Sequence, residues 1–216
     1  MKKIQIWRLK ILVAVLFSVV LISLTYYTGL RSLYVNLQVG FASSIIFYFF
    51  VVWLPERQKN KIIKENLGQT YSTFKKRMVD IILSLVEGCC NYDDSIKLLD
   101  HTKLKAFLDS NNRENLYKFY NQLEDRQDYL DEIIFEFEIL SKEIEYTLNH
   151  AQIKNKKSFA RLKNIVAMVY MFRHTQKHDY EKVKCIANQV LSLLTRFNMM
   201  DGQLEYDIIQ ETIDSL

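Results

Sequence analysis

The sequence predicts an all-α protein, with an N-terminal two-helix transmembrane hairpin followed by an elongated cytoplasmic helical bundle with coiled-coil-like helices. Two long uncharged apolar runs lie at the N-terminus, and such runs are typical of membrane spans. One proline and five glycines in 216 residues leave few helix breakers. Beyond residue 56, apolar residues recur at alternating steps of four and three, the repeat of packed helices.

Residues 1–55 are predicted to form the hairpin, with spans at about 11–30 and 33–54. At about 1.5 Å per residue, each uncharged run is long enough to cross the roughly 30 Å hydrocarbon core. Only Arg31 separates the two runs, so their connection is a tight turn. A cleavable signal peptide is the competing interpretation of the first run. The length of that run and the second run directly behind it favour a span.

Positive charges give the orientation of the hairpin. Four lysines or arginines precede the first span, one lies in the turn, and four follow the second span. Cytoplasmic ends carry the excess of such residues, so both termini are predicted to be cytoplasmic. The whole chain has a net charge of +4. The first 55 residues have a net charge of +5, so the remaining residues have a net charge of −1. The basic balance therefore does not indicate a generally cationic domain.

One face of the second span carries small and polar residues at helical spacing: Asn36, Gly40, Ser43, Ser44 and Phe47. Two interpretations stay open for this stripe, a packing seam between helices or the lining of a water-filled pore in a homo-oligomer. Neither span contains a charged side chain. A proton relay, a charged selectivity ring and a voltage sensor therefore lack their usual residues.

Residues 56–87 are predicted to form a juxtamembrane helical stalk, and residues 88–216 the cytoplasmic helical bundle. A turn is expected at 88–94, with Asp93 or Asp94 capping the next helix, and a second break at 110–112. The apolar seam of the stalk consists of Leu67, Tyr71, Phe74, Met78, Ile81 and Leu85.

The longest predicted helix covers residues 113–150, where the four-three repeat continues for five heptads and implies a length of roughly 50 Å. Its predicted partners are helices at 159–172, with Phe159 as the first core residue, at 183–197 and at 204–216. Short loops between them favour antiparallel packing.

Charge is divided into blocks within the bundle. Residues 124–145 hold nine acids and two bases, whereas residues 154–184 hold nine bases and two acids. Mutual pairing of two adjacent helices is one explanation. The other is a ligand-binding role, for a nucleic acid or a phosphorylated ligand, of the basic cluster. We define this cluster as Lys154, Lys156, Lys157, Arg161 and Lys163.

Motifs of catalysis are missing from the sequence, which has no P-loop, no dinucleotide-binding glycine pattern, no G-x-S-x-G and no H-E-x-x-H. We therefore expect neither an enzyme nor a cofactor. His174 and His178 are four residues apart and could share a metal, but apart from Asp179 or Cys185 no third ligand with sensible spacing is evident, so no metal site is expected. Cys89, Cys90 and Cys185 are interpreted as reduced, buried or half-buried side chains.

The layout of a hairpin, the basic juxtamembrane stretch LPERQKNKII at 54–63 and a helical cytoplasmic domain resembles the small two-span membrane effectors of bacterial antiphage defence. Within that group it is similar to the channel effector of the Hailong type. The resemblance implies an oligomeric ion channel of the bacterial inner membrane that is controlled by an oligonucleotide or nucleotide-derived ligand. The rival expectation is a membrane-anchored scaffold or receptor that recruits a cytosolic protein.

Overall fold

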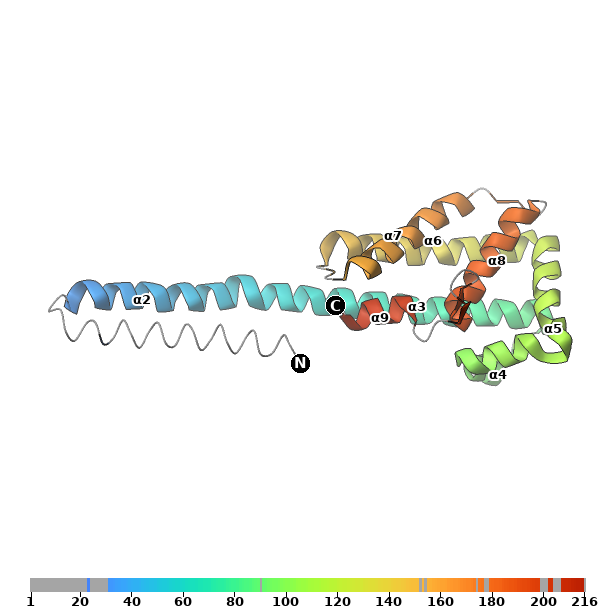
Figure 1. Ribbon diagram of the computed structural model, residues 1–216, viewed down its shortest axis with the longest axis horizontal. Coiled ribbons are helices and arrows are strands. Elements are labelled where there is room, and N and C mark those ends of the chain that lie inside the picture. Colours follow the sequence, from blue (N-terminus) through green and yellow to red (C-terminus); the bar gives the residue numbers. More distant parts are fainter. Residues whose placement is uncertain are drawn as a thin grey trace. The chain divides into compact units, whose positions relative to one another are not determined.

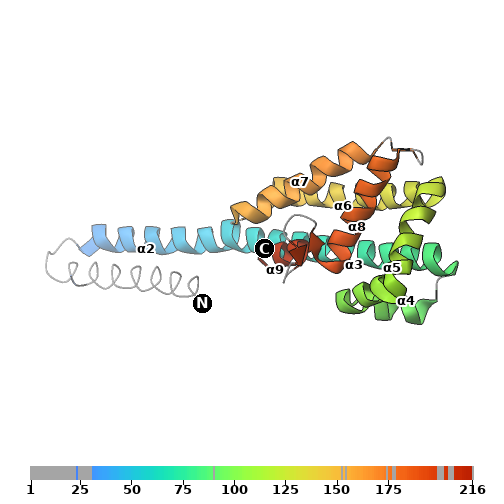
Figure 2. The same cartoon turned by 45° about the vertical axis from the view of Figure 1, so that its right-hand side comes forward.

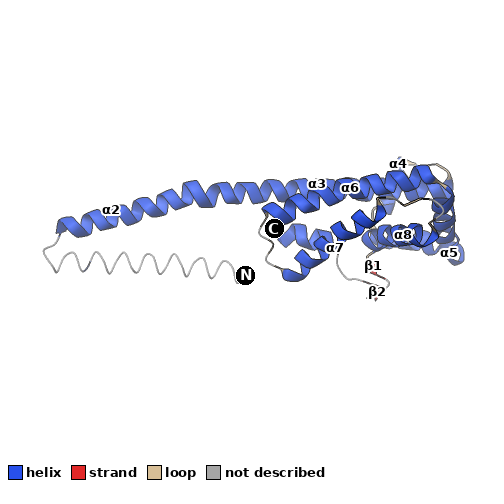
Figure 3. Ribbon diagram, turned by 90° about the horizontal axis from the view of Figure 1, so that it is seen from above, coloured by secondary structure: helices blue, strands red, loops and turns tan. Residues whose placement is uncertain are grey.

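The computed structural model describes residues 23, 31–89, 91–151, 153, 155–173, 175–176, 179–198, 202–203 and 207–215. These residues are almost entirely helical, as predicted, apart from two strands of two residues each (Figure 3). The predicted first span at 11–30 lies outside the described residues except for Ser23. The chain divides into two compact units, Met1–Lys59 and Asn60–Leu216.

In the first unit, helix α2 (Arg31–Phe47) is followed by a π-helical segment, η1 (Tyr48–Trp53). The backbone N–H of Leu54 donates to the carbonyl oxygen of Phe49, five residues back, as in a π-helix. Pro55 accounts for this local widening, because a proline has no N–H and its ring clashes with the carbonyl one α-turn earlier. The helix α3 (Leu54–Glu87) then begins in this unit and ends in the second.

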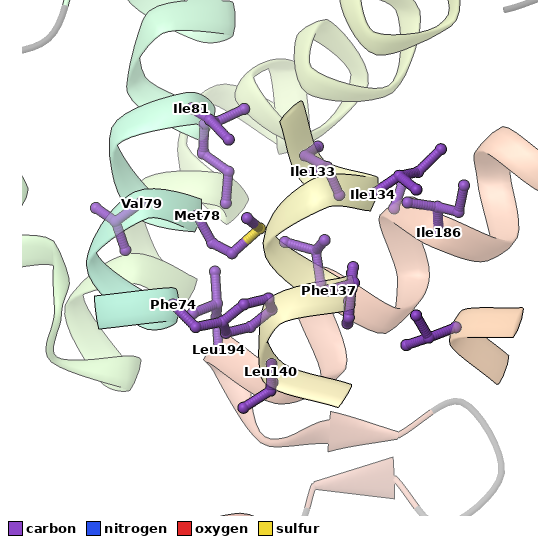
Figure 4. Packing of buried hydrophobic residues seen from close by; sticks show 14 of the residues in the cluster. Phe74, Met78, Val79, Ile81, Ile133, Ile134, Phe137, Leu140, Ile186 and Leu194 are labelled. Atoms are coloured by element: carbon purple, nitrogen blue, oxygen red, sulfur yellow. The ribbon is translucent and has the colours of Figure 1, made fainter. Parts of the chain in front are cut away.

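The core of the second unit forms around α3. All six residues of the predicted seam are buried, none of them more than 6% exposed. Figure 4 shows Phe74 and Met78 of α3 facing Ile133 and Phe137 from another helix, and the rings of Phe74 and Phe137 lie 5.0 Å apart. Aromatic and branched side chains at this spacing bury the most apolar area per residue, which makes α3 the central element of the core.

Helix α3 ends at the predicted turn. Gly88 takes a left-handed conformation with φ +76°, which glycine adopts without the steric cost of a Cβ atom. The next helix, α4 (Tyr92–Leu98), is capped by Asn91, whose side chain accepts from the backbone N–H of Asp93. The prediction of Asp93 or Asp94 as the cap was wrong, because the helix begins one residue before them.

Helix α5 (His101–Asp125) contains the predicted break as a distortion, since Arg113 has φ +68° within it. The single long helix predicted for 113–150 was wrong. Arg126 is extended (φ −116°, ψ 93°), and it separates α5 from α6 (Gln127–His150). Its guanidinium forms hydrogen bonds of 3.0 and 2.8 Å with Asp128. Leu123 and Leu130 on either side are both fully buried, so the apolar repeat continues across the break and conceals it.

The remaining elements are α7 (Lys156–Phe172), α8 (Tyr180–Thr195), β1 (Phe197–Asn198), β2 (Gly202–Gln203) and α9 (Ile208–Ser215). The strands are antiparallel, with Phe197 opposite Gln203. Within the second unit, α7 packs against α6, α8 against α5, and α9 lies along α3 (Figures 1 and 2). Phe159, predicted to be in the core, is 42% exposed, because the buried face of α7 begins at Ser158 and continues at Leu162.

A polar cluster joins the chain before α9 to α3. The hydroxyl of buried Tyr71 donates to the carboxylate of Asp207 at 2.8 Å, and Lys75 lies 3.6 Å from the same carboxylate. Asp207 also accepts from the backbone N–H of Gln210, so it caps α9. Burial, and then the charge of Asp207, raise the pKa of Tyr71 well above its ordinary value, which keeps this hydroxyl a donor.

Candidate functional site

The polar stripe predicted for the second span lies on α2 and is exposed. Asn36, Gly40, Ser43, Ser44 and Phe47 are all exposed, and Phe47 is 62% exposed. A Cβ atom added to Gly40 would meet nothing within 4 Å. The hydroxyl of Ser44 donates to the carbonyl oxygen of Gly40 at 2.8 Å, so this side chain is satisfied within its own helix. The stripe is thus an open surface that includes small groups and a locally paired hydroxyl.

Gln38 lies on a different face of α2, about 200° around the helix from Asn36 at about 100° per residue. Its side-chain nitrogen is buried and forms no hydrogen bond with any part of the chain that the structure describes. An unpaired buried amide costs about 1–3 kcal/mol. Gln38 therefore does not belong to the stripe, and its amide is a polar group that further contacts would stabilise.

Aromatic side chains gather where the apolar run ends. The rings of Phe49 and Trp53 stack with centroids 4.8 Å apart, and the guanidinium of Arg57 lies 5.2 Å from the Trp53 ring. Tryptophan next to arginine is typical of the boundary between hydrocarbon and lipid headgroups. Among the described residues, one helix, Val35–Glu87, has a stretch long and apolar enough to cross a membrane, with mean hydropathy 1.9 and none of it buried.

The basic cluster lies at the start of α7, although Lys154 is outside the described residues. Asn155 caps this helix by accepting from the backbone N–H of Lys157. Lys156, Lys157 and Lys163 are exposed, and Arg161 is half-buried. Cations at a helix N-terminus oppose the positive end of the helix dipole, so Lys156 and Lys157 do not stabilise α7 through it. They concentrate positive potential next to the unpaired N–H groups of the first turn.

The acidic and basic blocks do meet, at the other end of α7. Arg173 forms an ion pair of 2.9 Å with Glu138 of α6, and Tyr170 donates to Glu145 at 2.8 Å. Within the described part of the chain, Lys156, Lys157 and Lys163 take part in no ion pair. Mutual pairing therefore accounts for Arg173 and, among the described residues, does not account for these three lysines.

A groove of about 350 Å³ between α3 and α6 was missed by the sequence analysis. Arg77, Glu136 and Glu143 contribute its charged side chains. Burial raises the pKa of Glu136 and of Glu143, and the Arg77 charge lowers that of Glu136. The Oε1 atom of Glu143 is buried and without a hydrogen-bond partner among the described residues. The sequence feature that could have indicated this groove is the pair Glu136 and Glu143, two acids seven residues apart beside the buried face of α6.

The thiols are not where the sequence analysis placed them. Cys89 and Cys185 are both exposed, which corrects the expectation of burial. Cys89 lies in the turn after α3, and Cys185 lies on the outer face of α8 between buried Val183 and Ile186. Cys90, His174 and His178 lie outside the described residues. No group of three metal-ligating side chains occurs among those that are described.

No protein-family model matches this chain, and neither a curated protein nor a solved structure is significantly similar to it. The residues themselves therefore supply the argument for function.

Proposed function

We propose that this protein is an oligomeric membrane effector of bacterial antiphage defence that forms a ligand-controlled ion channel or pore. In this proposal it resides in the bacterial inner membrane as a two-span hairpin with both termini in the cytoplasm. The stripe on α2 lines the pore, and the basic cluster on α7 binds an oligonucleotide or nucleotide-derived ligand. The defence setting comes from the resemblance of layout to two-span effectors.

The observation that carries the proposal is the combination of exposed apolar side chains and an exposed polar stripe on one helix. Large apolar side chains such as Leu37, Val39 and Ile46 are at least half exposed on the same helix, and lipid is the solvent that suits them. Hydroxyl and amide groups in hydrocarbon need partners, and water in a pore supplies them. A pore shared between several copies would give each copy such a stripe.

Three exposed lysines in the first half of α7, Lys156, Lys157 and Lys163, support the proposal of an oligonucleotide ligand. Phosphate groups bind at helix N-termini, where backbone N–H groups are unpaired, and to nearby lysine side chains. Each phosphate contact on a single strand changes the slope of log affinity against log salt by about 0.7. We expect the variant Lys156→Gln/Lys157→Gln/Lys163→Gln to bind short single-stranded oligodeoxynucleotides more weakly and with a shallower salt dependence. The control variant Lys97→Gln/Lys103→Gln/Lys118→Gln removes the same charge elsewhere and should bind normally.

The deciding experiment is ion flux through liposomes that contain the full-length protein, with and without such oligonucleotides. Asn36→Leu/Ser43→Leu removes two of the three polar side chains of the stripe and leaves Ser44, whose hydroxyl is bonded within its own helix, so it should abolish the flux. Val39→Leu/Ile46→Leu, on exposed apolar positions outside the stripe, should leave it intact. Flux that survives the stripe variant would show that α2 does not line a pore.

The second candidate is a membrane-anchored scaffold that recruits a cytosolic protein. Exposed apolar side chains on α6 favour it, since Phe135 is 59%, Ile139 39% and Tyr146 45% exposed on one side of the helix. Apolar residues that recur on an exposed helix face are typical of contact surfaces. Absence of flux from well-inserted protein, with or without oligonucleotide, would favour this function.

A further inference from the structure

A pocket of about 390 Å³ lies between the two halves of α5 and helix α8, away from the basic cluster. Its volume is in the range of sites that hold small molecules, about 300–1,000 Å³. Three leucines, one on each half of α5 and one on α8, form its apolar wall: Leu108, Leu116 and Leu191. Charged and polar groups line the rest of it: Lys105, Asp109, Arg113, Tyr120, Asn188 and Thr195.

The distortion in α5 creates this pocket. Arg113 has φ +68°, a left-handed conformation that is uncommon for a residue with a side chain. Side chains on both sides of the distortion bond to one carbonyl oxygen before it: Asn115 donates to the carbonyl oxygen of Phe107 at 2.8 Å. Ser110 donates to the same oxygen at 2.7 Å. The bend is thus held by specific bonds, and residues from both sides of it line the same pocket.

A strained backbone that is held in place is a feature of binding sites. Glycine would adopt the Arg113 conformation at lower steric cost, yet this position carries a guanidinium that lines the pocket. Its partner Asp109 lies on the same helix at 3.6 Å, and the two side chains are 64% and 45% exposed. A surface pair of this kind is worth about 0–1 kcal/mol, so an incoming anion can replace it.

The deeper side of the pocket offers neutral hydrogen-bonding groups. Tyr120 donates its hydroxyl to the side-chain oxygen of Asn188, and burial raises the pKa of Tyr120, so the hydroxyl stays protonated at neutral pH. The amide nitrogen of Asn188 forms no hydrogen bond with any described residue. This nitrogen is a donor for a polar atom of a ligand that rests on the leucines.

We propose that this pocket is a binding site for a small amphipathic anion, an apolar body with one carboxylate or comparable acidic group. The leucines contact the apolar body, Arg113 binds the acidic group, and the Tyr120–Asn188 pair orients the ligand. The site uses none of the residues assigned to the pore or to the oligonucleotide, so it stands independently of the proposed function.

The test is isothermal titration calorimetry of 2-naphthoate into the full-length protein in lipid nanodiscs, with the heat of empty nanodiscs subtracted. The comparison ligand is 2-naphthalenemethanol, which has the same ring system without the charge. Naphthoate should bind more tightly. Arg113→Gly keeps the backbone conformation and removes the guanidinium, and it should weaken naphthoate binding about tenfold, as for loss of one charge-assisted hydrogen bond.

Three further variants complete the design. Arg113→Lys keeps the charge and should retain most of the affinity, Leu191→Phe fills the apolar wall and should weaken binding of both ligands, and Lys118→Gln, on α5 outside the pocket, should change nothing. Thermal unfolding confirms that each variant is folded. The proposal is overturned if naphthoate does not bind, binds no better than the alcohol, or binds equally to Arg113→Gly.

Discussion

At the scale of single residues, the second unit contains a polar pair, Tyr71 and Asp207, that is shielded from solvent. Tyr71 was predicted as a seam residue, and its burial follows from the four-three repeat of α3. Its partner Asp207 is 136 positions away, and no local pattern connects the two. The sequence thus predicts which tyrosine is buried, whereas only the folded chain shows which carboxylate accepts from it.

Tyr71→Phe should destabilise the second unit by about 1–3 kcal/mol, because the Asp207 carboxylate would stay buried after losing a hydrogen-bond donor. The Asp207 side chain is only 8% exposed, so water cannot easily replace the lost Tyr71 hydroxyl as its donor. Chemical unfolding followed by circular dichroism measures the change. Tyr117→Phe, at a side chain that is 60% exposed, is the control and should stay within about 0.5 kcal/mol of the unmodified protein.

Glu143→Gln should stabilise the protein at neutral pH by less than about 1 kcal/mol, since the groove that holds it is open to solvent. Burial raises the pKa of Glu143 above its ordinary 4.5. When the pKa of a carboxyl is higher in the folded state than in the unfolded state, the contribution of that carboxyl to stability is fully present below the unfolded-state pKa. The contribution is lost as pH rises through the folded-state pKa. The difference between the proteins should therefore vanish below pH 4.5.

Unfolding curves over this pH range give the comparison. Glu145→Gln is the matched control on α6, because the Glu145 carboxylate accepts a hydrogen bond from Tyr170 and its replacement should bring no gain. A constant difference at all pH values would show that the effect of Glu143→Gln does not arise from titration of this carboxyl.

At the scale of elements, apolar spacing predicted helices well and their ends less well. The buried faces of α3, α7 and α8 follow directly from the repeat, because burial and the helical period come from the same residues. The ends depend on single backbone conformations. Extended Arg126 interrupts a repeat whose apolar positions continue without a gap, and Asn91 rather than an aspartate caps α4. Such features leave little trace in the periodicity.

Two glycine-to-alanine substitutions, one within α3 and one in the turn directly after it, should have opposite effects. Gly68→Ala should stabilise the protein by about 0.5–1 kcal/mol, because alanine is the better helix former. Its Cβ would meet Ile213 at 3.8 Å, an ordinary contact. Gly88→Ala should destabilise it by about 1 kcal/mol, because φ there is +76°. Thermal unfolding of both variants tests the pair, and shifts of the same sign would contradict the reason given for each.

At the scale of the whole molecule, the chain consists of two compact units, and among the described residues the buried hydrophobic side chains lie within Asn60–Leu216. Sequence analysis predicted a stalk over 56–87, and these boundaries stay a prediction. Most of α3 belongs to the second unit and supplies ten of its buried residues. Amphipathic spacing alone does not distinguish a stalk from the central helix of a domain, since both need one apolar face.

A fragment of residues 60–216 should therefore fold without the first unit and unfold cooperatively, because it contains the complete core. A fragment of residues 88–216 is the matched comparison. It lacks the α3 side chains that contact Phe137 and α9, and it should show reduced helicity and no cooperative transition. Circular dichroism and thermal unfolding of the two fragments decide the matter. Equal behaviour would mean that α3 is dispensable for this fold.

The candidate sites were predictable to different degrees. The stripe on α2 and the lysines of α7 could be proposed from the sequence because the residues of each set are close in the chain, at helical spacing in the stripe and with one charge in the lysines. Both the groove beside Glu143 and the pocket beside Arg113 combine residues from helices far apart in the chain, and these were missed. In the second case the break at 110–112 was predicted, but its consequence, a cavity against α8, depends on tertiary packing.

The π-helical segment before Pro55 has a consequence for how the sequence of this region can change. A helix with hydrogen bonds to the fifth residue back encloses one residue more in each hydrogen-bonded ring than an ordinary α-helix. Deleting one residue between Tyr48 and Trp53 would let the chain return to α geometry while the polar stripe and the Trp53–Arg57 contact are both retained. This segment is therefore the place in the first unit where a change in length is tolerated best, and related proteins are expected to differ there by single-residue gaps.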